Sequence, residues 1–318
     1  MIRLHLPDLP GFAPQDAVFL PAGCCPDVEA CLASGALLLE QAGIETARLD
    51  AECLVASVLG RARWQLLLDR RRRLSREEFC RVLRLIRRRE RREPLAYILG
   101  TREFWSLPMS VSPGVLVPRP ETETLVEAAL AAWKEMGAGR QADGPRIVEL
   151  CTGSGAVAIA LASELPTARI LATDVSWRAL RVARANAERN GVAGRIGFLR
   201  GNLWHAVNGQ APPGTVDLVV ANPPYIPTVE LAALMPEVQW EPKLALDGGE
   251  DGLRVIREIV ATSSDRIRPG GFLLLEIGSD QAAAVQALVA ASGRWEPARV
   301  RCDLAGRPRV VVARRLQM

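Results

Sequence analysis

The chain has 318 residues, of which 49% are hydrophobic and 24% charged, a composition typical of a globular protein long enough for two domains. Its seven cysteines show neither metal-ligand nor redox spacing, which argues against a disulfide framework or a metal site and favours reduced thiols in the cytoplasm. The net charge of +4 points to no particular acidic partner, and no apolar run approaches the ~18 residues of a membrane span.

The first 26 residues are rich in proline and lack the charged start and apolar core of a signal peptide. We expect residues 1–26 to form a flexible tail.

Residues 27–93 have a helical pattern and predict a small helical bundle. Asp27 is a candidate N-cap for a first helix that ends near Gly43, and 47–59 and 63–69 predict two further helices. Ser75 and Glu78 have the spacing of a capping box, which opens a last helix with apolar residues inward and arginines outward.

The last part of this bundle is strongly basic. Residues 61–93 carry fourteen arginines against five acidic residues, a local excess of nine positive charges. Either this is a solvated helix surface, or it is a docking surface for an acidic protein or RNA. Only Trp64 is interleaved with these arginines for stacking on bases, which argues against direct reading of single strands.

Residues 94–118 are strand-like and rich in turn residues, and predict a hairpin that links the two domains. From 119 to 318 the pattern alternates between strands and helices, which predicts an α/β domain with a mostly parallel sheet covered on both faces. The expected strands are 147–150, 170–174, 196–200, 216–221, 271–277 and 309–314, and the expected helices are 122–136, 156–164, 177–190 and 252–266.

The apolar strand that begins at Val216 runs directly into Asn222-Pro223-Pro224-Tyr225. Two prolines cannot lie inside a strand, so the strand must end at Asn222, and the carboxyl ends of parallel strands are where ligands bind. The Asn oxygen and a proline carbonyl can accept the two hydrogens of a planar NH2 group, with Tyr225 packed on its face. The alternative is a stiff turn without a ligand.

A second candidate site follows the strand 147–150. Gly153 and Gly155 allow a ligand close to the backbone, and Asp174 ends the next strand, where its carboxylate can accept both ribose hydroxyls of an adenosine. The alternatives are close helix packing for the glycines and an N-cap for Asp174, although Ser176 can fill that role.

Both NAD and S-adenosylmethionine carry an adenosine. Ala158 stands where a full G-x-G-x-x-G motif has its third glycine, and hydride transfer needs no site for an amino group, so the pattern favours the methyl donor. His5 and His205 are the only histidines, and no Ser-His-Asp or Cys-His arrangement is visible. Catalysis is therefore expected to work by position and electrostatics, with Asn222 as the central residue and Tyr225 as a packing wall.

Seven segments of the chain resemble one enzyme family. They are EPLAYILG (93–100), VLVPRPETE (115–123), VELCTGSGAVAIALA (148–162), NPPYIP (222–227), EPKLALDGGEDGL (241–253), LLLEIGSDQ (273–281) and DLAGRPRVV (303–311). With these segments the chain resembles the PrmC/HemK family of peptide chain release factor glutamine methyltransferases, over most of residues 30–318.

The resemblance implies methyl transfer from S-adenosylmethionine to the side-chain amide of the glutamine in the GGQ motif of class I release factors, with S-adenosylhomocysteine as product. The implied fold is a class I methyltransferase domain, Rossmann-like with a mostly parallel seven-stranded sheet, after a helical domain that helps grip the substrate protein and a hairpin linker. A monomer without stable nucleic-acid or membrane partners is expected. The implied cofactor positions are Cys151, Thr152, Gly153, Ser154, Gly155, Asp174, Asn202 and Leu203. The implied catalytic and substrate positions are Asn222, Pro223, Pro224 and Tyr225, with Arg119 and Glu123 on the substrate side.

Two departures stand out: Asn202 where the family usually has Asp beside the adenine, and Cys151 in place of the commoner Gly. Two rival functions remain open. A nucleic-acid adenine-N6 methyltransferase would suit NPPY and the basic bundle, although the region after NPPY is acidic. A non-catalytic S-adenosylmethionine-binding module is the other.

Overall fold

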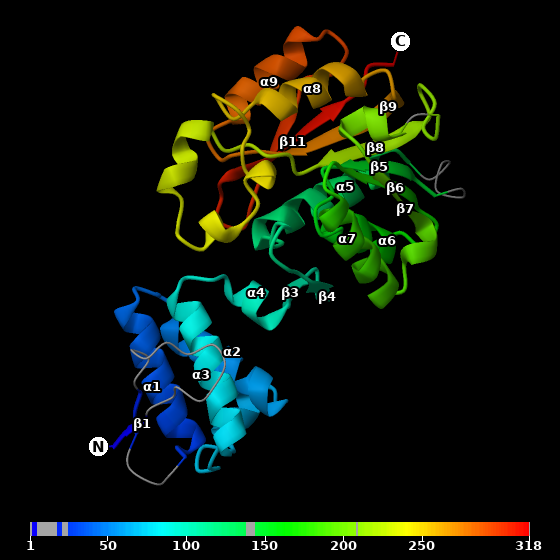
Figure 1. Ribbon diagram of the computed structural model, residues 1–318. Helices are drawn as coiled ribbons and strands as arrows, with labels where there is room; N and C mark the ends of the chain where they lie inside the picture. The colour runs from blue at the N-terminus through cyan, green and yellow to red at the C-terminus, as the bar shows by residue number, and fades with distance from the viewer. Residues whose placement is uncertain (1, 5–17, 21–24, 138–143, 208, 318) are drawn as a thin grey trace. The chain divides into compact units, whose positions relative to one another are not determined.

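The computed structural model describes residues 2–4, 18–20, 25–137, 144–207 and 209–317 (Figure 1). The chain divides into two compact units, Met1–Leu99 and Gly100–Met318. Within the predicted tail, Ile2–Leu4 (β1) and Val18–Leu20 (β2) pair as antiparallel strands, and most of the other tail residues lie outside the described part. In the described residues no helix is long and apolar enough to span a bilayer.

The first unit is a helical bundle, as predicted. Its elements are α1 (Val28–Gln41), α2 (Ala47–Leu59), the 3-10 helix η1 (Arg63–Leu67), α3 (Arg76–Glu90) and α4 (Leu95–Leu99). Asp27 caps α1 by accepting the Ala30 N–H at 2.8 Å, and Ser75 and Glu78 form the predicted capping box. Apolar residues such as Leu39, Leu54 and Ile86 are fully buried between the helices.

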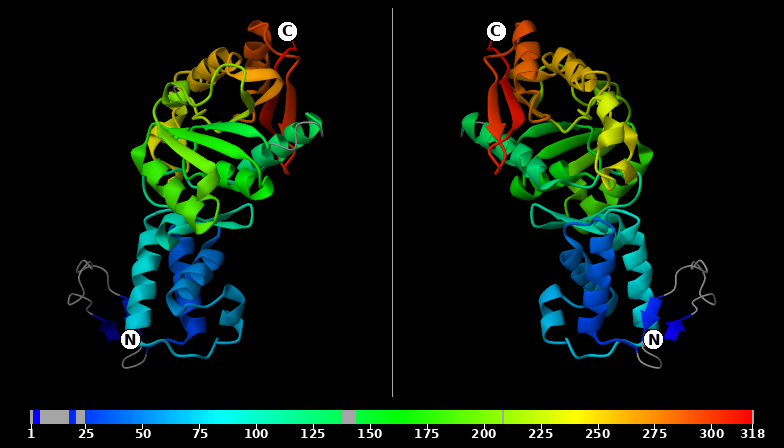
Figure 2. Two further views of the ribbon diagram at one scale, coloured as in Figure 1. Left: turned by 90° about the vertical axis from the view of Figure 1, so that its right-hand side faces the viewer. Right: turned by 90° about the vertical axis from the view of Figure 1, so that its left-hand side faces the viewer.

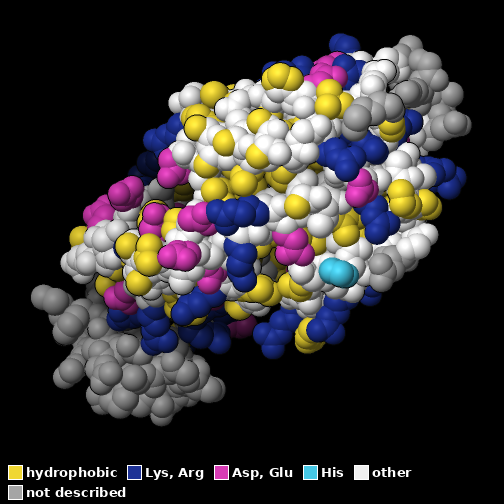
Figure 3. All heavy atoms as spheres, turned by 90° about the horizontal axis from the view of Figure 1, so that it is seen from above, with side chains coloured by type: hydrophobic (Ala, Val, Ile, Leu, Met, Phe, Trp, Pro, Cys, Tyr) yellow, Lys and Arg dark blue, Asp and Glu magenta, His cyan; other side chains and the backbone are white. Residues whose placement is uncertain are grey.

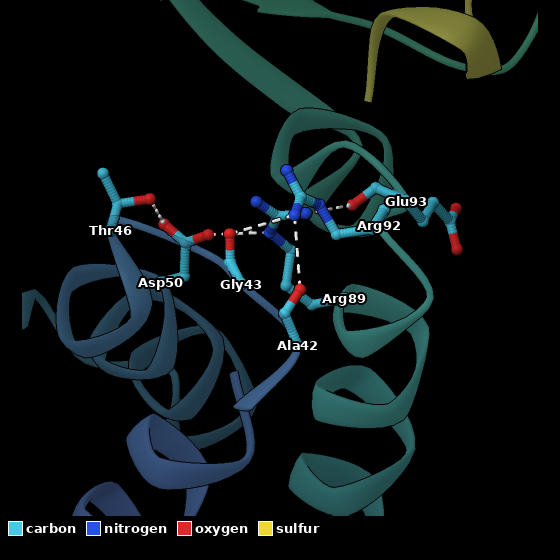
Figure 4. Close-up of polar contacts among 7 residues, drawn as sticks. All are labelled: Ala42, Gly43, Thr46, Asp50, Arg89, Arg92 and Glu93. Atoms are coloured by element: carbon cyan, nitrogen blue, oxygen red, sulfur yellow. Dashed lines mark hydrogen bonds and ion pairs between the residues drawn. The ribbon is translucent and has the colours of Figure 1, made fainter. Parts of the chain in front are cut away.

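One arginine of the basic segment lies inside this bundle, where all were expected to point outward. Arg89 donates to Asp50 at 2.7 Å, and the two side chains are 6% and 5% exposed (Figure 4). Thr46 also donates to Asp50, and Arg92 reaches the Ala42 and Gly43 carbonyls across the bundle (Figure 4). The arginine-rich sequence therefore partly ties the helices together, since a buried charge is tolerated only when it is paired.

Acidic neighbours neutralise other arginines of the segment. The ion pairs include Arg72–Glu78, Arg87–Glu90 and Arg88–Glu93. These acids are already counted in the local excess, but Arg63–Glu52, Arg70–Glu29 and Arg89–Asp50 pair with acids outside residues 61–93 and so reduce it.

The second unit begins with a hairpin of β3 (Thr101–Phe104) and β4 (Leu107–Ser110). This confines the hairpin to the middle of the predicted segment 94–118, because residues 95–99 form helix α4. Asn186 on α7 (Trp177–Arg189) anchors the hairpin: its amide accepts the Ser110 N–H at 2.7 Å and donates to the Ser110 carbonyl at 3.0 Å.

A seven-stranded sheet forms the core of this unit, with strand order β10-β11-β9-β8-β5-β6-β7. The strands are β5 (Arg146–Leu150), β6 (Arg169–Asp174), β7 (Ile196–Arg200), β8 (Val216–Ala221), β9 (Ile267–Glu276), β10 (Arg299–Cys302) and β11 (Pro308–Arg314). Strands β5 to β9 pair in parallel, and β11 pairs antiparallel with both β9 and β10. The class I methyltransferase fold is confirmed.

Helices cover both faces of the sheet (Figures 1 and 2). Successive residues of a strand point to opposite faces of the sheet, and here both faces are apolar. On one face, Ile147 and Leu218 pack toward α5 (Glu123–Glu135), α6 (Ala156–Glu164) and α7 (Trp177–Arg189). Their neighbours Val148 and Val219 pack toward α8 (Arg254–Ser263) and α9 (Ala282–Ala291) on the other face. The chain order reverses between β5 and β8, and this switch point is where α/β sheets bind ligands.

Candidate active site

A cavity of about 250 Å³ lies at the carboxyl ends of the strands next to this switch point. Seven of the predicted site residues line it: Cys151, Gly153, Asp174, Asn202, Leu203, Asn222 and Pro224. Thr152, Ser154, Gly155, Pro223 and Tyr225 belong to the same loops but do not line the cavity. The structure therefore brings together the glycine-rich turn, the acid at the end of β6 and the start of NPPY.

The glycine-rich turn combines three residues in the left-handed region: Cys151 (φ 61°), Gly153 (φ 56°) and Gly155 (φ 81°). A Cβ on Gly155 would lie 2.9 Å from the Ala183 Cβ, so this glycine allows α7 to pack against the turn. A Cβ on Gly153 would meet no atom within 4 Å. The two glycines thus serve different purposes: Gly155 allows helix packing, and Gly153 keeps the cavity wall open to a ligand.

A buried carboxyl group supports the turn from below. Glu149 on β5 accepts the Thr152 hydroxyl at 2.5 Å and is 3% exposed. Burial raises the pKa of Glu149 to about 8, partly offset by the hydrogen bonds from Thr152 and the Ala158 N–H. Glu149 is thus a structural acid rather than part of the cavity wall.

Asp174 joins the turn to the end of β6. Its Oδ2 accepts the Gly153 N–H at 2.9 Å, and its Oδ1 accepts the Ser176 N–H at 2.8 Å. Burial raises the pKa of Asp174, and these N–H donors act in the opposite direction. Ser176 caps α7 by accepting the Ala179 N–H, so Asp174 does not serve as the helix cap. The carboxylate lines the cavity and can still accept from a ligand hydroxyl.

Glu258 on α8 also lines the cavity, and the sequence analysis did not identify it. Asn202 donates to its Oε1 through Nδ2 at 3.2 Å, which leaves the Asn202 oxygen as an acceptor. Leu203 follows in the left-handed region (φ 43°) and begins the 3-10 helix η5 (Leu203–Val207). No local pattern identifies Glu258, since it comes from a helix 56 residues further along the chain.

Two further segments contribute to the cavity wall: Gly114–Leu116 and the residues Pro242, Leu244 and Ala245. A carboxylate joins them, because Glu241 accepts the Val117 N–H at 3.1 Å and pairs with Arg119. Arg119, predicted on the substrate side, is thus engaged with Glu241. Glu123, predicted there too, accepts the Trp105 N–H at 2.7 Å and lies outside the cavity wall.

The NPPY loop begins where β8 ends, and β8 is buried along its whole length. Asn222 donates through Nδ2 to the Thr122 hydroxyl at 3.3 Å. The Tyr225 carbonyl accepts from Gln281 at 2.8 Å, and burial raises the pKa of the Tyr225 phenol to about 12, so the ring is neutral. The NPPY loop is therefore held at its start by Thr122 and at its end by Gln281.

The segment 246–252 holds the same loop further on. Ile226 N donates to the Leu246 carbonyl at 2.9 Å, and Gly248 N donates back to the Ile226 carbonyl at 2.8 Å. A Cβ on Gly252 would lie 2.3 Å from the Tyr225 carbonyl oxygen, so only glycine fits there. The motif ALDGGEDGL thus fixes the path of the NPPY loop.

Comparisons with known proteins agree with this geometry. Residues 30–100 match the family model of the PrmC N-terminal domain, and residues 138–235 match the methyltransferase small domain. The chain is similar to the release factor glutamine methyltransferase of Bradyrhizobium diazoefficiens, with 41% identity over 91% of this chain and 95% of the relative. It is 42% identical to the protein of the same name from Moorella thermoacetica, over 87% of this chain and 94% of the relative.

Among solved structures, the second unit's fold is similar to the hMettl16 catalytic domain in complex with MAT2A 3′UTR hairpin 6. The TM-score is 0.54 at 15% identity, over 69% of this chain and 80% of that one, which supports the fold alone. The high identity to the two bacterial relatives over nearly their full length shows the family: this chain belongs to the release factor glutamine methyltransferases.

Proposed function

We propose that the protein transfers a methyl group from S-adenosylmethionine to the side-chain amide nitrogen of the glutamine in the GGQ motif of class I release factors, and so modulates translation termination. The observation that carries the proposal is the single cavity shared by Asp174, Gly153 and Asn222. One side of this cavity has the groups that a nucleoside needs, and the other has an acceptor for an NH2 group. The names of the relatives support the same reaction.

The residues of the cavity fit the methyl donor. The Asp174 carboxylate lines the cavity and can accept from the ribose hydroxyls, and Gly153 leaves space for a ligand against the backbone. Asn202 can accept from the adenine amino group through Oδ1, because its Nδ2 is engaged with Glu258. Cys151, Leu203 and the backbone of the turn from Thr152 to Gly155 complete this side. When bound, S-adenosylmethionine supplies an electrophilic methyl group on a sulfonium.

On the substrate side, the protein holds and orients a weak nucleophile. An amide nitrogen has a delocalised lone pair, and hydrogen bonds from its NH2 group to the Asn222 Oδ1 and the Pro223 carbonyl would increase its electron density. Pro224 and Tyr225 continue this rigid wall, and the neutral Tyr225 ring supplies an apolar contact without competing for a proton. No general base is required, because the nitrogen becomes acidic only after transfer. Catalysis then comes from position and electrostatics.

Arg119 and Glu123 have a supporting role in this proposal. Their contacts with Glu241 and Trp105 hold the segment that leads into α5, from which Thr122 reaches Asn222. The helical region 27–93 is proposed to grip the release factor, with 94–118 as the linker and 119–318 as the methyltransferase domain. The match of residues 30–100 to the PrmC N-terminal domain supports a separate N-terminal domain.

Two observations count against a nucleic-acid substrate. Several arginines of the basic segment are paired with acids, and Arg89 is buried. The one face seen in Figure 3 carries basic side chains interspersed with acidic ones, so that face is not the predominantly basic surface that nucleic acid favours. A non-catalytic binding module would not need Asn222 to be held in one orientation.

The test is methyl transfer from labelled S-adenosylmethionine to three acceptors: a class I release factor, its GGQ→GGA variant, and duplex DNA. Label on the wild-type factor alone is expected. Asn222→Ala should lower the rate by about 10²–10³-fold, comparable to the loss of one oriented hydrogen-bonding group in other enzymes. Gln210→Ala, at an exposed residue away from the cavity, should keep the wild-type rate. Label on DNA or on the GGA variant would refute the proposal.

A further inference from the structure

We propose that Glu276 and Thr122 are positioning residues that determine which way the Asn222 amide faces, so that Asn222 presents its oxygen and not its NH2 group to the substrate. The inference rests on the proposed function, because it explains how the site selects a substrate NH2.

The sheet brings these residues together. In the parallel pair β8–β9, Ala221 lies opposite Leu275, so Asn222 and Glu276 follow side by side at the carboxyl ends of the two strands. Thr122 ends the 3-10 helix η2 (Pro120–Thr122) directly before α5, 100 residues before Asn222 in the chain. Glu276 is 1% exposed and Thr122 is 5% exposed. Glu276 and Thr122 are thus buried beside Asn222, which is half-buried and lines the cavity.

The hydrogen bonds of these three side chains have one possible direction when Glu276 is ionised. Thr122 acts on the carboxyl of Glu276 by lowering its pKa. A carboxylate only accepts, so we expect the Thr122 hydroxyl to donate its single proton to Glu276. The Thr122 oxygen can then only accept, and it accepts from Asn222 Nδ2 at 3.3 Å. A hydroxyl alone could donate or accept, and would leave both orientations of the Asn222 amide open. With its proton committed to Glu276, it admits only the orientation in which Oδ1 faces away from Thr122.

The surroundings of Glu276 make this direction sensitive to pH. Burial has the largest effect on Glu276, and Arg309 and Arg119 oppose it while Glu121 adds to it; together they raise the pKa of Glu276 to about 7. The neutral Tyr225 phenol is the other titratable group that interacts with Glu276. The Oε2 atom of Glu276 has no hydrogen-bond partner in the described part of the chain, so this oxygen has room for a proton. A protonated Glu276 no longer requires the Thr122 proton, and Thr122 is then free to donate toward Asn222.

The experiment compares the wild-type protein with Glu276→Gln, Thr122→Val and Thr122→Ser. Methyl transfer to the release factor is measured as kcat and KM between pH 6 and 9, and folding is checked by thermal melting. In the wild type, kcat should fall below pH ~7 as Glu276 becomes protonated. Glu276→Gln and Thr122→Val should lower kcat by about 10–100-fold and lose this acidic limb, since both remove the fixed direction. Thr122→Ser keeps the hydroxyl and should keep both the rate, within about threefold, and the limb.

A second readout does not depend on activity. The side-chain NH2 signals of Asn222 in ¹⁵N-asparagine-labelled protein, assigned by their loss in Asn222→Asp, should shift with pH in the wild type and stay constant in Thr122→Val. Even if Glu276→Gln failed to fold, the comparison of Thr122→Ser with Thr122→Val would decide the matter.

If the wild type is active and Glu276→Gln or Thr122→Val has the same kcat and the same acidic limb as the wild type, this inference is overturned. The proposed function would still stand. A wild type that does not methylate the release factor would overturn the proposed function, and with it the role of these residues.

Discussion

The carboxylate of Asp174 accepts the backbone N–H of Gly153 at 2.9 Å, across 21 residues of sequence. This contact fixes the turn after β5 against the end of β6, so one side chain both shapes the cavity and lines it. The same carboxylate accepts the Ser176 N–H at the start of α7. A substitution of Asp174 therefore affects both the shape of the cavity and the proposed contact with the ligand. A control substitution at another carboxylate that accepts backbone N–H groups is needed to separate the two effects.

Asp174→Asn should weaken S-adenosylmethionine binding by about 10–100-fold, the usual value of hydrogen bonds to a charged group. The amide NH2 would also face one of the two N–H donors, so the protein should lose stability. Asp303→Asn is the control, because Asp303 likewise accepts two backbone N–H groups, from Ala305 and Arg307, and lies outside the cavity wall. Calorimetric titration should show normal cofactor affinity in Asp303→Asn, and equal losses in both variants would contradict the role of Asp174.

Two alanine substitutions in the glycine-rich turn should have different effects. Gly155→Ala places a Cβ 2.9 Å from Ala183 at a φ of 81°, so we expect a loss of about 2–4 kcal/mol in the free energy of unfolding. Gly153→Ala meets no atom within 4 Å and should cost only the backbone strain of about 1–2 kcal/mol. Its added methyl group faces the cavity side and should weaken cofactor binding instead. Urea unfolding and cofactor titration of both variants test the contrast, and equal stability losses would refute it.

Most helices and strands of the second unit were predictable because their apolar patterns are regular and their ends carry glycine or capping residues. The six strands expected from the sequence are present, with boundaries that differ by a few residues, and the seventh, β10, was missed. Its sequence, Arg299–Cys302, alternates only weakly and is largely exposed, so it becomes a strand only by pairing with β11. The helix α9 was also missed, since its alanine-rich sequence shows little amphipathic pattern.

In the candidate site, too, some residues could be identified from the sequence and others could not. Asp174, Gly153 and Asn222 could be identified because each stands at or just after the end of a strand, with a glycine-rich turn at Gly153 and two prolines after Asn222. Glu258, Thr122 and Glu276 could not, because their importance depends on contacts across 56 and 100 residues and on the pairing of β8 with β9. Such neighbours are set by the register of the sheet, which local patterns do not reveal.

Introducing at position 202 the acid that the resemblance implies should not improve cofactor binding in this chain. Asn202 Nδ2 lies 3.2 Å from Glu258 Oε1, so Asn202→Asp would place two carboxylates side by side. We expect Asn202→Asp to bind S-adenosylmethionine less tightly than the wild type. The double variant Asn202→Asp/Glu258→Gln removes the repulsion and should regain affinity, with a coupling of about 1–2 kcal/mol in the double-mutant cycle. Tighter binding by Asn202→Asp alone would show that Glu258 does not interact with this position.

Glu149→Gln tests the buried acid beneath the turn through the pH dependence of stability. The pKa of Glu149 is raised from 4.5 to about 8, so between these values the folded state holds a proton that the unfolded state has lost. The free energy of unfolding should therefore fall as pH rises through this window, by at most about 1.4 kcal/mol per pH unit from this group. In Glu149→Gln the fall should be shallower, with a residual slope up to pH ~7 because burial raises the pKa of Glu276 in the same direction. Urea unfolding between pH 5 and 8 measures both slopes. As a control, Glu103→Gln changes an exposed carboxylate, and its free energy of unfolding should depend on pH as in the wild type. If Glu149→Gln also showed the wild-type pH dependence, Glu149 would not carry a proton in the folded state.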